Sequence, residues 1–328
     1  MKYGIVLAAP TIADQVRVAR RAEQAGFDSA WTIEFFNQNG HVRLAAVAAA
    51  TESITVGNAI AYAFMRTPLL TASAAMDIDE LSGGRMVLGL GSGTRSMNER
   101  WYSSAWQTPA PARMKEVVAL VRAAFAASGG GGLKFEGEFY NANVPLYARP
   151  GMVRDSIPVY VAGVARPMVR AAAAVADGLV GHPVYTRKYI ADSVLPILEG
   201  SDCELAPYVI CSVSDDVEQA RNEARMQIAF YFTTRLYHTI LDAHGWRDRG
   251  EVIAAAFKRM DFAAMTAEVS DEMIDAIAIT GRPDEVRDQL RQWDGLSEQV
   301  LLYPPTVGVA HERVSENLDA MVDAFAVS

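Results

Sequence analysis

The chain contains little cysteine and no long apolar segment. Its 328 residues include two cysteines, Cys203 and Cys211, whose separation matches no zinc or redox spacing. Two buried apolar thiols explain them better than a disulfide, and low cysteine use is typical of a reducing compartment, so we expect a cytoplasmic protein. No apolar run approaches the ~20 residues of a membrane span, and the apolar start MKYGIVLAAP is too short for a signal peptide.

Motifs for several familiar chemistries are also missing. The five histidines form neither H-E-x-x-H nor another metal pair, so we expect no metal. The glycines of Gly89–Gly93 lack the dinucleotide spacing, and neither a Walker A sequence nor a G-x-S-x-G elbow occurs. The net charge of -9 argues against nucleic-acid and anionic-membrane partners, although it leaves room for a local basic pocket. These absences favour chemistry carried by a bound cofactor.

What the sequence does contain is a regular alternation of short apolar runs and amphipathic segments. Strands buried on both faces and separated by helices are typical of a parallel sheet, and eight such units predict an α/β fold of the (β/α)8 TIM barrel type. We expect one domain over residues 1–328, although ~150 residues per domain would allow two. The predicted strands cover 3–8, 29–32, 55–60, 86–90, 158–162, 179–181, 207–213 and 300–303.

Two segments interrupt this alternation. Residues 133–147 alternate like a hairpin, which predicts an insertion after the fourth helix. Residues 216–278 are helical and too long for one crossover, which predicts a helical insertion before the eighth strand. In such barrels the loops after the strands build the site, so the residues that follow each strand are the candidates.

The most distinctive string is Asp79–Arg85, followed by an apolar run and the turn Gly91–Gly93. It predicts a helix end with Gly83 or Gly84 in the left-handed conformation. Glycines at Gly91 and Gly93 allow a ligand to approach the backbone closely. A tight turn without a ligand explains them as well.

A second string, from Val159 to Pro167, predicts a strand, a small-residue turn and a helix with proline in its first turn. The turn contains Gly163, Val164, Ala165 and Arg166. Free N–H groups at a helix N-terminus favour an anion, and Arg166 adds positive charge. A phosphate site and a plain turn both fit this pattern.

Three further candidates follow predicted strands. Glu34 follows the second strand, where a barrel carries catalytic side chains, although a solvated carboxylate is an equal alternative. Small residues in Gly57–Tyr62 allow a flat ring to lie on the backbone at the end of the third strand. His182 follows the sixth strand and lines the mouth or serves only the fold.

Taken together, these strings resemble the bacterial luciferase-like superfamily over nearly the whole chain. Asp79–Arg85 with Gly89–Gly93 resembles the D-x-L-S-G-G-R stretch and its glycine turn. Trp31–Phe36 resembles the W-x-x-E-H-H stretch, residues 158–178 resemble the P-v-y-v-x-G segment, and residues 279–286 resemble the G-x-P-e-e-v segment.

The resemblance implies a bound coenzyme. The family includes flavin-dependent monooxygenases and oxidoreductases that use the deazaflavin coenzyme F-420, and this chain is more similar to the second, especially to methylenetetrahydromethanopterin reductase. It implies a non-prolyl cis peptide bond between Ala59 and Ile60 behind the deazaflavin ring, and a phosphate at Gly163–Arg166. It also implies a homodimer packed through early helices, for which residues 45–50 offer small side chains. The residues expected to bind the coenzyme are Asn58, Ala59, Ile60, Gly91, Gly93, Gly163, Val164, Ala165 and Arg166, with the acidic tail passing some of Arg95, Arg100, Arg166 and Arg187.

The chain departs from the family pattern where relatives carry acid–base groups. Phe35 stands where many members have His after the acid, and Thr94 stands where sugar-phosphate dehydrogenases have an acid. Oxidising an alcohol needs a base, so we favour a reductase that transfers hydride to a C=C or C=N bond of a small organic substrate. Glu34 is then the best candidate acid or polar anchor, with a pKa raised by apolar neighbours.

Phe35, Tyr62 and His182 are expected to line the substrate pocket, and aromatic residues at 230–237 either cap it or pack in the core. The alternative enzyme is a two-component monooxygenase that uses reduced FMN and oxygen. A noncatalytic cofactor-binding relative is the third possibility, because the His is missing.

Overall fold

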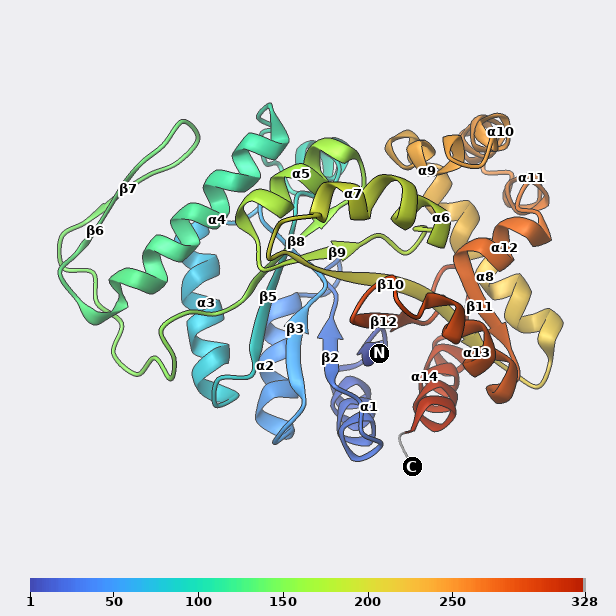
Figure 1. Ribbon diagram of the computed structural model, residues 1–328, viewed down its shortest axis with the longest axis horizontal. Coiled ribbons are helices and arrows are strands. Elements are labelled where there is room, and N and C mark those ends of the chain that lie inside the picture. Colours follow the sequence, from blue (N-terminus) through green and yellow to red (C-terminus); the bar gives the residue numbers. More distant parts are fainter. Residues whose placement is uncertain (327–328) are drawn as a thin grey trace.

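Eight parallel strands close into a barrel, as predicted (Figure 1). The computed structural model describes residues 1–326. Closure depends on β10, which pairs with β9 on one side and β12 on the other, while β12 pairs with β1. Around the barrel the strands are β1 (Lys2–Val6), β2 (Ser29–Thr32), β3 (Thr55–Asn58), β5 (Met86–Gly91), β8 (Val159–Gly163), β9 (Gly178–Gly181), β10 (Glu204–Val213) and β12 (Gln299–Tyr303).

Helices cover the outside of the barrel, and several begin at residues that cap them. The side chains of Thr11, Asn39 and Thr67 each accept an N–H from the first turn of the helix that follows. Gly26, with φ 84°, ends the first helix in the left-handed conformation. The covering helices are α1 (Ile12–Gln24), α2 (Gly40–Ala50), α3 (Pro68–Leu81), α4 (Ala110–Ala126), α5 (Arg166–Val175), α6 (Arg187–Tyr189), α7 (Leu195–Leu198), α13 (Pro283–Leu290) and α14 (His311–Phe325).

Large rings fill the barrel interior, and neighbouring strands make room for them with glycine. Trp31 on β2 and Tyr160 on β8 lie with ring centroids 5.9 Å apart. A Cβ at Gly57 on β3 would meet the Trp31 ring at 2.4 Å, so only glycine fits beside it. The interior is therefore a packed core, and a ligand can reach only its rim.

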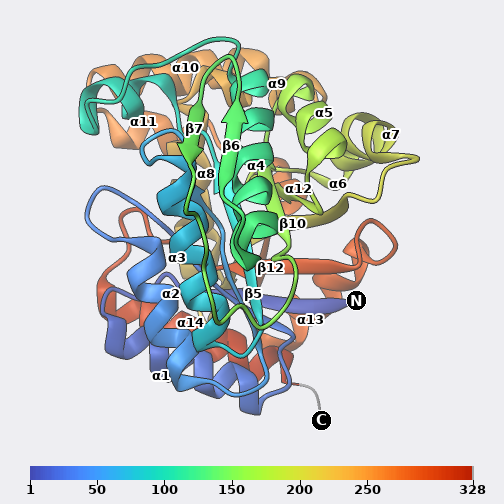
Figure 2. The same cartoon turned by 90° about the vertical axis from the view of Figure 1, so that its left-hand side faces the viewer.

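The two predicted insertions are present. β6 (Leu133–Glu136) and β7 (Asn141–Val144) form an antiparallel hairpin that projects from the side of the barrel (Figure 1). The helical insertion comprises α8 (Val217–Phe232), α9 (His238–Asp242), α10 (Arg247–Lys258), α11 (Phe262–Ala267) and α12 (Asp271–Ile277). In Figures 1 and 2, α9 and α10 lie at the end of the barrel to which β2 points.

The last part of this insertion corrects the prediction. A short strand, β11 (Ala278–Gly281), follows α12 and pairs with Ile210–Val213 at the end of β10. β10 is long enough to pair with β9 near its start and with β11 near its end. The helical prediction ended at residue 278 and missed this strand, because four residues are too few to show a strand period.

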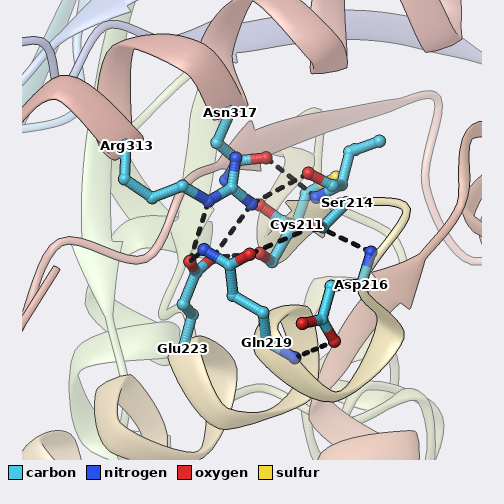
Figure 3. A network of polar contacts seen from close by, with 9 residues as sticks. Cys211, Ser214, Asp216, Gln219, Glu223, Arg313 and Asn317 are labelled. Carbon is cyan, nitrogen blue, oxygen red and sulfur yellow. Dashed lines mark hydrogen bonds and ion pairs between the residues drawn. The ribbon is translucent and has the colours of Figure 1, made fainter. Parts of the chain in front are cut away.

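A buried polar network ties the insertion to the barrel (Figure 3). Glu223 on α8 accepts hydrogen bonds from Arg313 on α14 (2.8 Å) and from Ser212 on β10 (2.6 Å). Asn317 on α14 donates to the Cys211 carbonyl (3.0 Å) and accepts the Val213 N–H (2.8 Å). These contacts satisfy backbone hydrogen-bonding groups at the end of β10, where the strand exchanges its partner β12 for β11.

The D-x-L-S-G-G-R string lies at the opposite end of the barrel from the site. Arg85, just before β5, donates to the carbonyls of Ala48, Thr51 and Ile54 around the end of α2. Asp79 pairs with Arg154 at 2.6 Å and accepts the N–H of Met86. This string stabilises the bottom of the barrel and does not form part of the mouth.

Candidate functional site

The predicted site residues gather at the mouth formed by the C-terminal ends of the strands. Glu34 and Phe35 follow β2, Asn58–Tyr62 follows β3, Gly163–Arg166 follows β8 and His182 follows β9. Solvent reaches this end of the barrel, because residues at several strand ends keep exposed surface there: Ala8, Ile33, Ile60, Ala162 and His182. This juxtaposition follows directly from the parallel barrel, in which the C-terminal ends of all strands meet at one end.

The segment Asn58–Tyr62 forms a bulge between β3 and β4 (Ala61–Tyr62), and its Ala59–Ile60 peptide bond is cis, as the resemblance implies. The Ala59 N–H donates to the Thr32 carbonyl at 2.8 Å, and the Tyr208 hydroxyl donates to the Ala59 carbonyl. The bulge is therefore held from β2 and from β10. Ile60 keeps part of its side chain exposed at the mouth.

The glycines of β5 make room for this bulge. A Cβ at Gly89 would meet the Asn58 carbonyl oxygen at 1.8 Å, and one at Gly91 would meet the Ile60 side chain at 2.6 Å. On the Cβ side of Gly91 the space is taken by Ile60, and the role of Gly91 in binding a cofactor stays a prediction. Gly93, with φ 62°, turns the chain after the strand.

Glu34 is held in a buried ion pair. Both carboxylate oxygens accept from the guanidinium of Arg66, and one also accepts the Tyr62 N–H at 2.8 Å. Burial opposes ionisation, but the hydrogen bonds from Arg66 and Tyr62 outweigh it, so the pKa of Glu34 lies below its ordinary value. The predicted raised pKa is wrong, because the pattern of apolar neighbours did not reveal Arg66.

His41 and Asn58 lie beside this ion pair, and the sequence pattern did not single out His41. Both ring nitrogens of His41 and the Oδ1 of Asn58 are buried and have no hydrogen-bond partner among residues 1–326. Burial and the charge of Arg66 lower the pKa of His41 to about 4. A neutral imidazole therefore accompanies the ion pair at neutral pH.

The turn Gly163–Arg166 presents free backbone donors. In the described part of the chain, no residue accepts a hydrogen bond from the N–H groups of Val164, Ala165 or Arg166. The Gly163 and Val164 carbonyls accept the Tyr185 and Tyr189 hydroxyls at 2.7 and 2.9 Å. The donors stay free while the carbonyls are occupied, which is the arrangement that suits an anion at a helix N-terminus.

His182 packs between aromatic rings of the helical insertion. Its ring centroid lies 4.7 Å from that of Tyr231 and 4.0 Å from that of Tyr237. The Val184 N–H donates to its Nδ1 at 3.3 Å, so in the neutral ring the proton is on Nε2. Burial lowers the pKa of His182 to about 3, which keeps the ring an uncharged donor.

Tyrosines supply most of the remaining polar groups at the mouth, and sequence analysis missed most of them. Tyr62 contacts Tyr102, with ring centroids 5.7 Å apart, and Tyr208 contacts Tyr303 at 5.4 Å. Burial raises the pKa of Tyr62 well above its ordinary value. Tyr303 is the last residue of β12, so the strand pattern could have predicted that it lies at the mouth. Tyr208 lies in the middle of β10, and the pattern gives no reason to place it there.

An aromatic cluster lies at the rim. Trp101 packs edge to face against Phe35 and Phe36, with ring centroids 5.6 and 5.7 Å apart, and the two phenylalanine rings are tilted against each other at 4.6 Å. Trp101 ends the π-helix η1 (Met97–Trp101) after β5. Phe35, which stands where relatives carry His, is thus part of an apolar wall. No group of three or more His, Cys, Asp or Glu able to hold a metal ion occurs within residues 1–326.

The order and geometry of these elements match one family. Residues 2–297 match the family described as luciferase-like monooxygenase. The chain belongs to this family. None of the helices in residues 1–326 is both long and apolar enough to cross a bilayer.

Members of the luciferase-like family with similar sequences include proteins with and without a known reaction. An uncharacterised protein of Mycobacterium tuberculosis is 33% identical over 298 residues, which cover 85% of this chain and 86% of that protein. The 5,10-methylenetetrahydromethanopterin reductase of Archaeoglobus fulgidus is 31% identical over 284 residues, 83% of each chain.

A solved structure has the same fold. The coenzyme F-420-dependent tetrahydromethanopterin reductase of Methanopyrus kandleri superposes with a TM-score of 0.80 at 23% identity, covering 99% of both chains. At this identity the match concerns the barrel and its insertions.

Proposed function

We propose that the chain is a coenzyme F-420-dependent oxidoreductase that acts as a reductase on a small organic substrate. The observation that carries the proposal is the held bulge at Asn58–Tyr62, exposed at the mouth, with free N–H donors at Val164–Arg166 on the same end of the barrel. Its sequence relatives at about a third identity include a methylenetetrahydromethanopterin reductase.

The residues present fit this coenzyme. Ala59 and Ile60 would hold the flat ring, and Val164, Ala165 and Arg166 would hold the phosphate through backbone N–H groups and one guanidinium. The coenzyme supplies a hydride donor and acceptor when bound. Gly93 and Asn58 support the bulge and the turn around it.

The protein groups at the mouth favour reduction over alcohol oxidation. Glu34 is already ionised and engaged by Arg66, so it is a poor proton donor and a restricted base. We assign to it the anchoring of the bulge through the Tyr62 N–H rather than proton transfer. His182 and Tyr62 carry neutral donors that orient an uncharged substrate, and its proton comes from such a hydroxyl or from water.

We also propose that the protein is a homodimer. Arg43 is the only charged residue of helix α2 at neutral pH, and Val42 on its surface is 59% exposed. On the adjacent α3, Leu70 is 66% exposed. A second copy of this chain covering both helices would remove these apolar side chains from water.

Fluorescence titration tests the proposed coenzyme. Purified protein is titrated into F-420, FMN and their reduced forms, and quenching is followed. We expect tight F-420 binding and no FMN binding. FMN binding with oxygen consumption would support the family's monooxygenase chemistry instead, and binding of neither would support a noncatalytic relative.

A further inference from the structure

Two large aromatic side chains lie exposed and in contact with each other at the rim of the mouth. Phe36 is 63% exposed and Trp101 is 49% exposed. Their rings meet edge to face, and Trp101 meets the half-buried Phe35 in the same way. We call Phe35, Phe36 and Trp101 the rim cluster. Apolar rings that are exposed together mark a binding surface more often than apolar residues that are scattered singly.

The two phenylalanines of the rim cluster are fixed by the turn that carries them. Phe35 and Gln38 exchange backbone hydrogen bonds in both directions, each at 3.1 Å, so Phe36 lies in a closed turn. Phe35 and Phe36 stand at the two positions where the W-x-x-E-H-H stretch has histidine. This chain therefore has two apolar rings where the family pattern places two titratable ones.

Trp101 is held by the segment that follows β5. Asn98 is buried in the same π-helix, and its side chain donates to the carbonyls of Ser92 and Thr94, both at 2.9 Å. The Ser104 N–H donates to the Asn98 carbonyl at 2.8 Å. Short π-helical turns are frequent at functional sites. Trp101 is therefore exposed on a backbone that is fixed before and after it.

The rim cluster continues from the proposed coenzyme site. Glu34, directly before Phe35, accepts the Tyr62 N–H of the bulge at 2.8 Å. Tyr102, directly after Trp101, packs its ring against that of Tyr62, with centroids 5.7 Å apart. Burial raises the pKa of both tyrosines, so their hydroxyls are uncharged at neutral pH. A molecule that reaches from the bulge to the rim cluster meets aromatic surface and neutral side chains.

We propose that the rim cluster binds a flat, uncharged ring of the substrate, whose reducible bond lies over the bulge. The inference rests on the proposed function and narrows its substrate to compounds that carry such a ring. The Trp101 plane stands at 88° to Phe35 and at 87° to Phe36, so the rim cluster forms a corner. A flat ring stacks on one wall of a corner and meets the other with its edge, the two arrangements that aromatic pairs prefer. A rigid ring also loses less rotamer freedom on binding than a flexible chain does.

Binding of two unsaturated ketones tests the rim cluster. Calorimetric titrations of the protein loaded with oxidised F-420 compare benzylideneacetone, which carries a phenyl ring on its C=C bond, with ethylideneacetone, which carries a methyl group there. We expect the wild type to bind the phenyl ketone about tenfold more tightly. Phe36→Ser combined with Trp101→Ser is expected to reduce this preference to about twofold. Phe262→Ser, at a 45% exposed ring on α11, is the matched control and is expected to keep the wild-type preference.

The outcomes separate the ring site from the coenzyme site. If the wild type binds F-420 but does not prefer benzylideneacetone, or binds neither ketone, the inference is overturned while the proposed function stands. The same follows if the double variant binds F-420 and keeps the full preference, or if Phe262→Ser loses it equally. A wild type that does not quench F-420 refutes the proposed function and the inference together.

Light scattering and a single variant complete the test. If the double variant has half the mass of the wild type, the rim cluster is an interface between copies of this chain and the inference is overturned. Phe36→Ser alone, at the more exposed of the two rings, carries the same test if the double variant does not fold.

Discussion

At the scale of single residues, the ion pair of Glu34 with Arg66 makes a sharp prediction. Glu34→Gln leaves the guanidinium of Arg66 largely buried without a countercharge, and we expect a loss of about 2–3 kcal/mol in the free energy of unfolding. Adding Arg66→Met is expected to recover part of this loss. Urea unfolding of both single variants and the double variant measures the coupling.

An exposed pair offers the matched control. Glu99 pairs with Arg95 on the surface, so Glu99→Gln is expected to change the free energy of unfolding by less than about 0.5 kcal/mol. If the losses in the free energy of unfolding of the two single variants, at Glu34 and at Arg66, add up to the loss of the double variant, the two side chains do not stabilise each other.

His41 predicts a pH dependence of stability. Its pKa is lowered to about 4 in the folded chain and is about 6.5 in an unfolded one, so the unfolded state binds the proton first on acidification. The stability contributed by neutral His41 is complete above about pH 6.5 and is lost as the pH falls to about 4. We expect His41→Gln to lose about 2–3 kcal/mol less over this interval than the wild type.

Thermal unfolding at a series of pH values checks this. His311 is exposed, so His311→Gln is the control and is expected to follow the wild type. A parallel pH profile for His41→Gln and the wild type would mean that the ring is protonated in the folded chain as easily as in the unfolded one.

Single residues also mark the limit of sequence analysis. The position of Glu34 after β2 was predictable, but its ionisation state depends on Arg66, which lies 32 residues further along the chain. The neighbour of Gly91 was equally open from its residue type, and the structure places the Ile60 side chain there. Contacts between distant segments do not leave a periodic signal.

At the scale of elements, Asn317 links α14 to the end of β10 (Figure 3). Its side chain satisfies the Cys211 carbonyl and the Val213 N–H, both buried. Asn317→Ala is expected to cost about 2–4 kcal/mol, because two buried backbone groups lose their partners. Urea unfolding measures it, with Asn141→Ala on the exposed hairpin strand β7 as control.

A loss as small as that of the control would show that water replaces the Asn317 amide. Elements themselves were mostly predictable, since apolar periodicity located the eight barrel strands and the two insertions. The strand β11 was missed because it is short and is stabilised by pairing with β10, a tertiary contact.

At the scale of the whole molecule, the exposed apolar side chains of α2 and α3 predict a dimer. We expect light scattering to give twice the mass of the 35.6 kDa chain. Val42→Glu combined with Leu70→Glu is expected to produce a folded monomer, because two buried charges at an apolar interface are costly. Leu146→Glu, at a 94% exposed residue outside these helices, is the control.

A dimer that survives the Val42 and Leu70 substitutions would refute this face as the interface. Circular dichroism on the same samples distinguishes a dissociated chain from an unfolded one.

The sequence alone determined the barrel, its two insertions and the end at which the candidate site residues gather. These follow from local periodicity and from the rule that parallel strands bring their C-terminal ends together. Only the tertiary structure decided the chemistry of that end. It determines which carboxylate forms an ion pair, which side chain packs against each glycine, which tyrosines contact each other and which cations have no partner. Charge and hydrogen bonding depend on distances between side chains from different strands, and the barrel sets those distances when it closes.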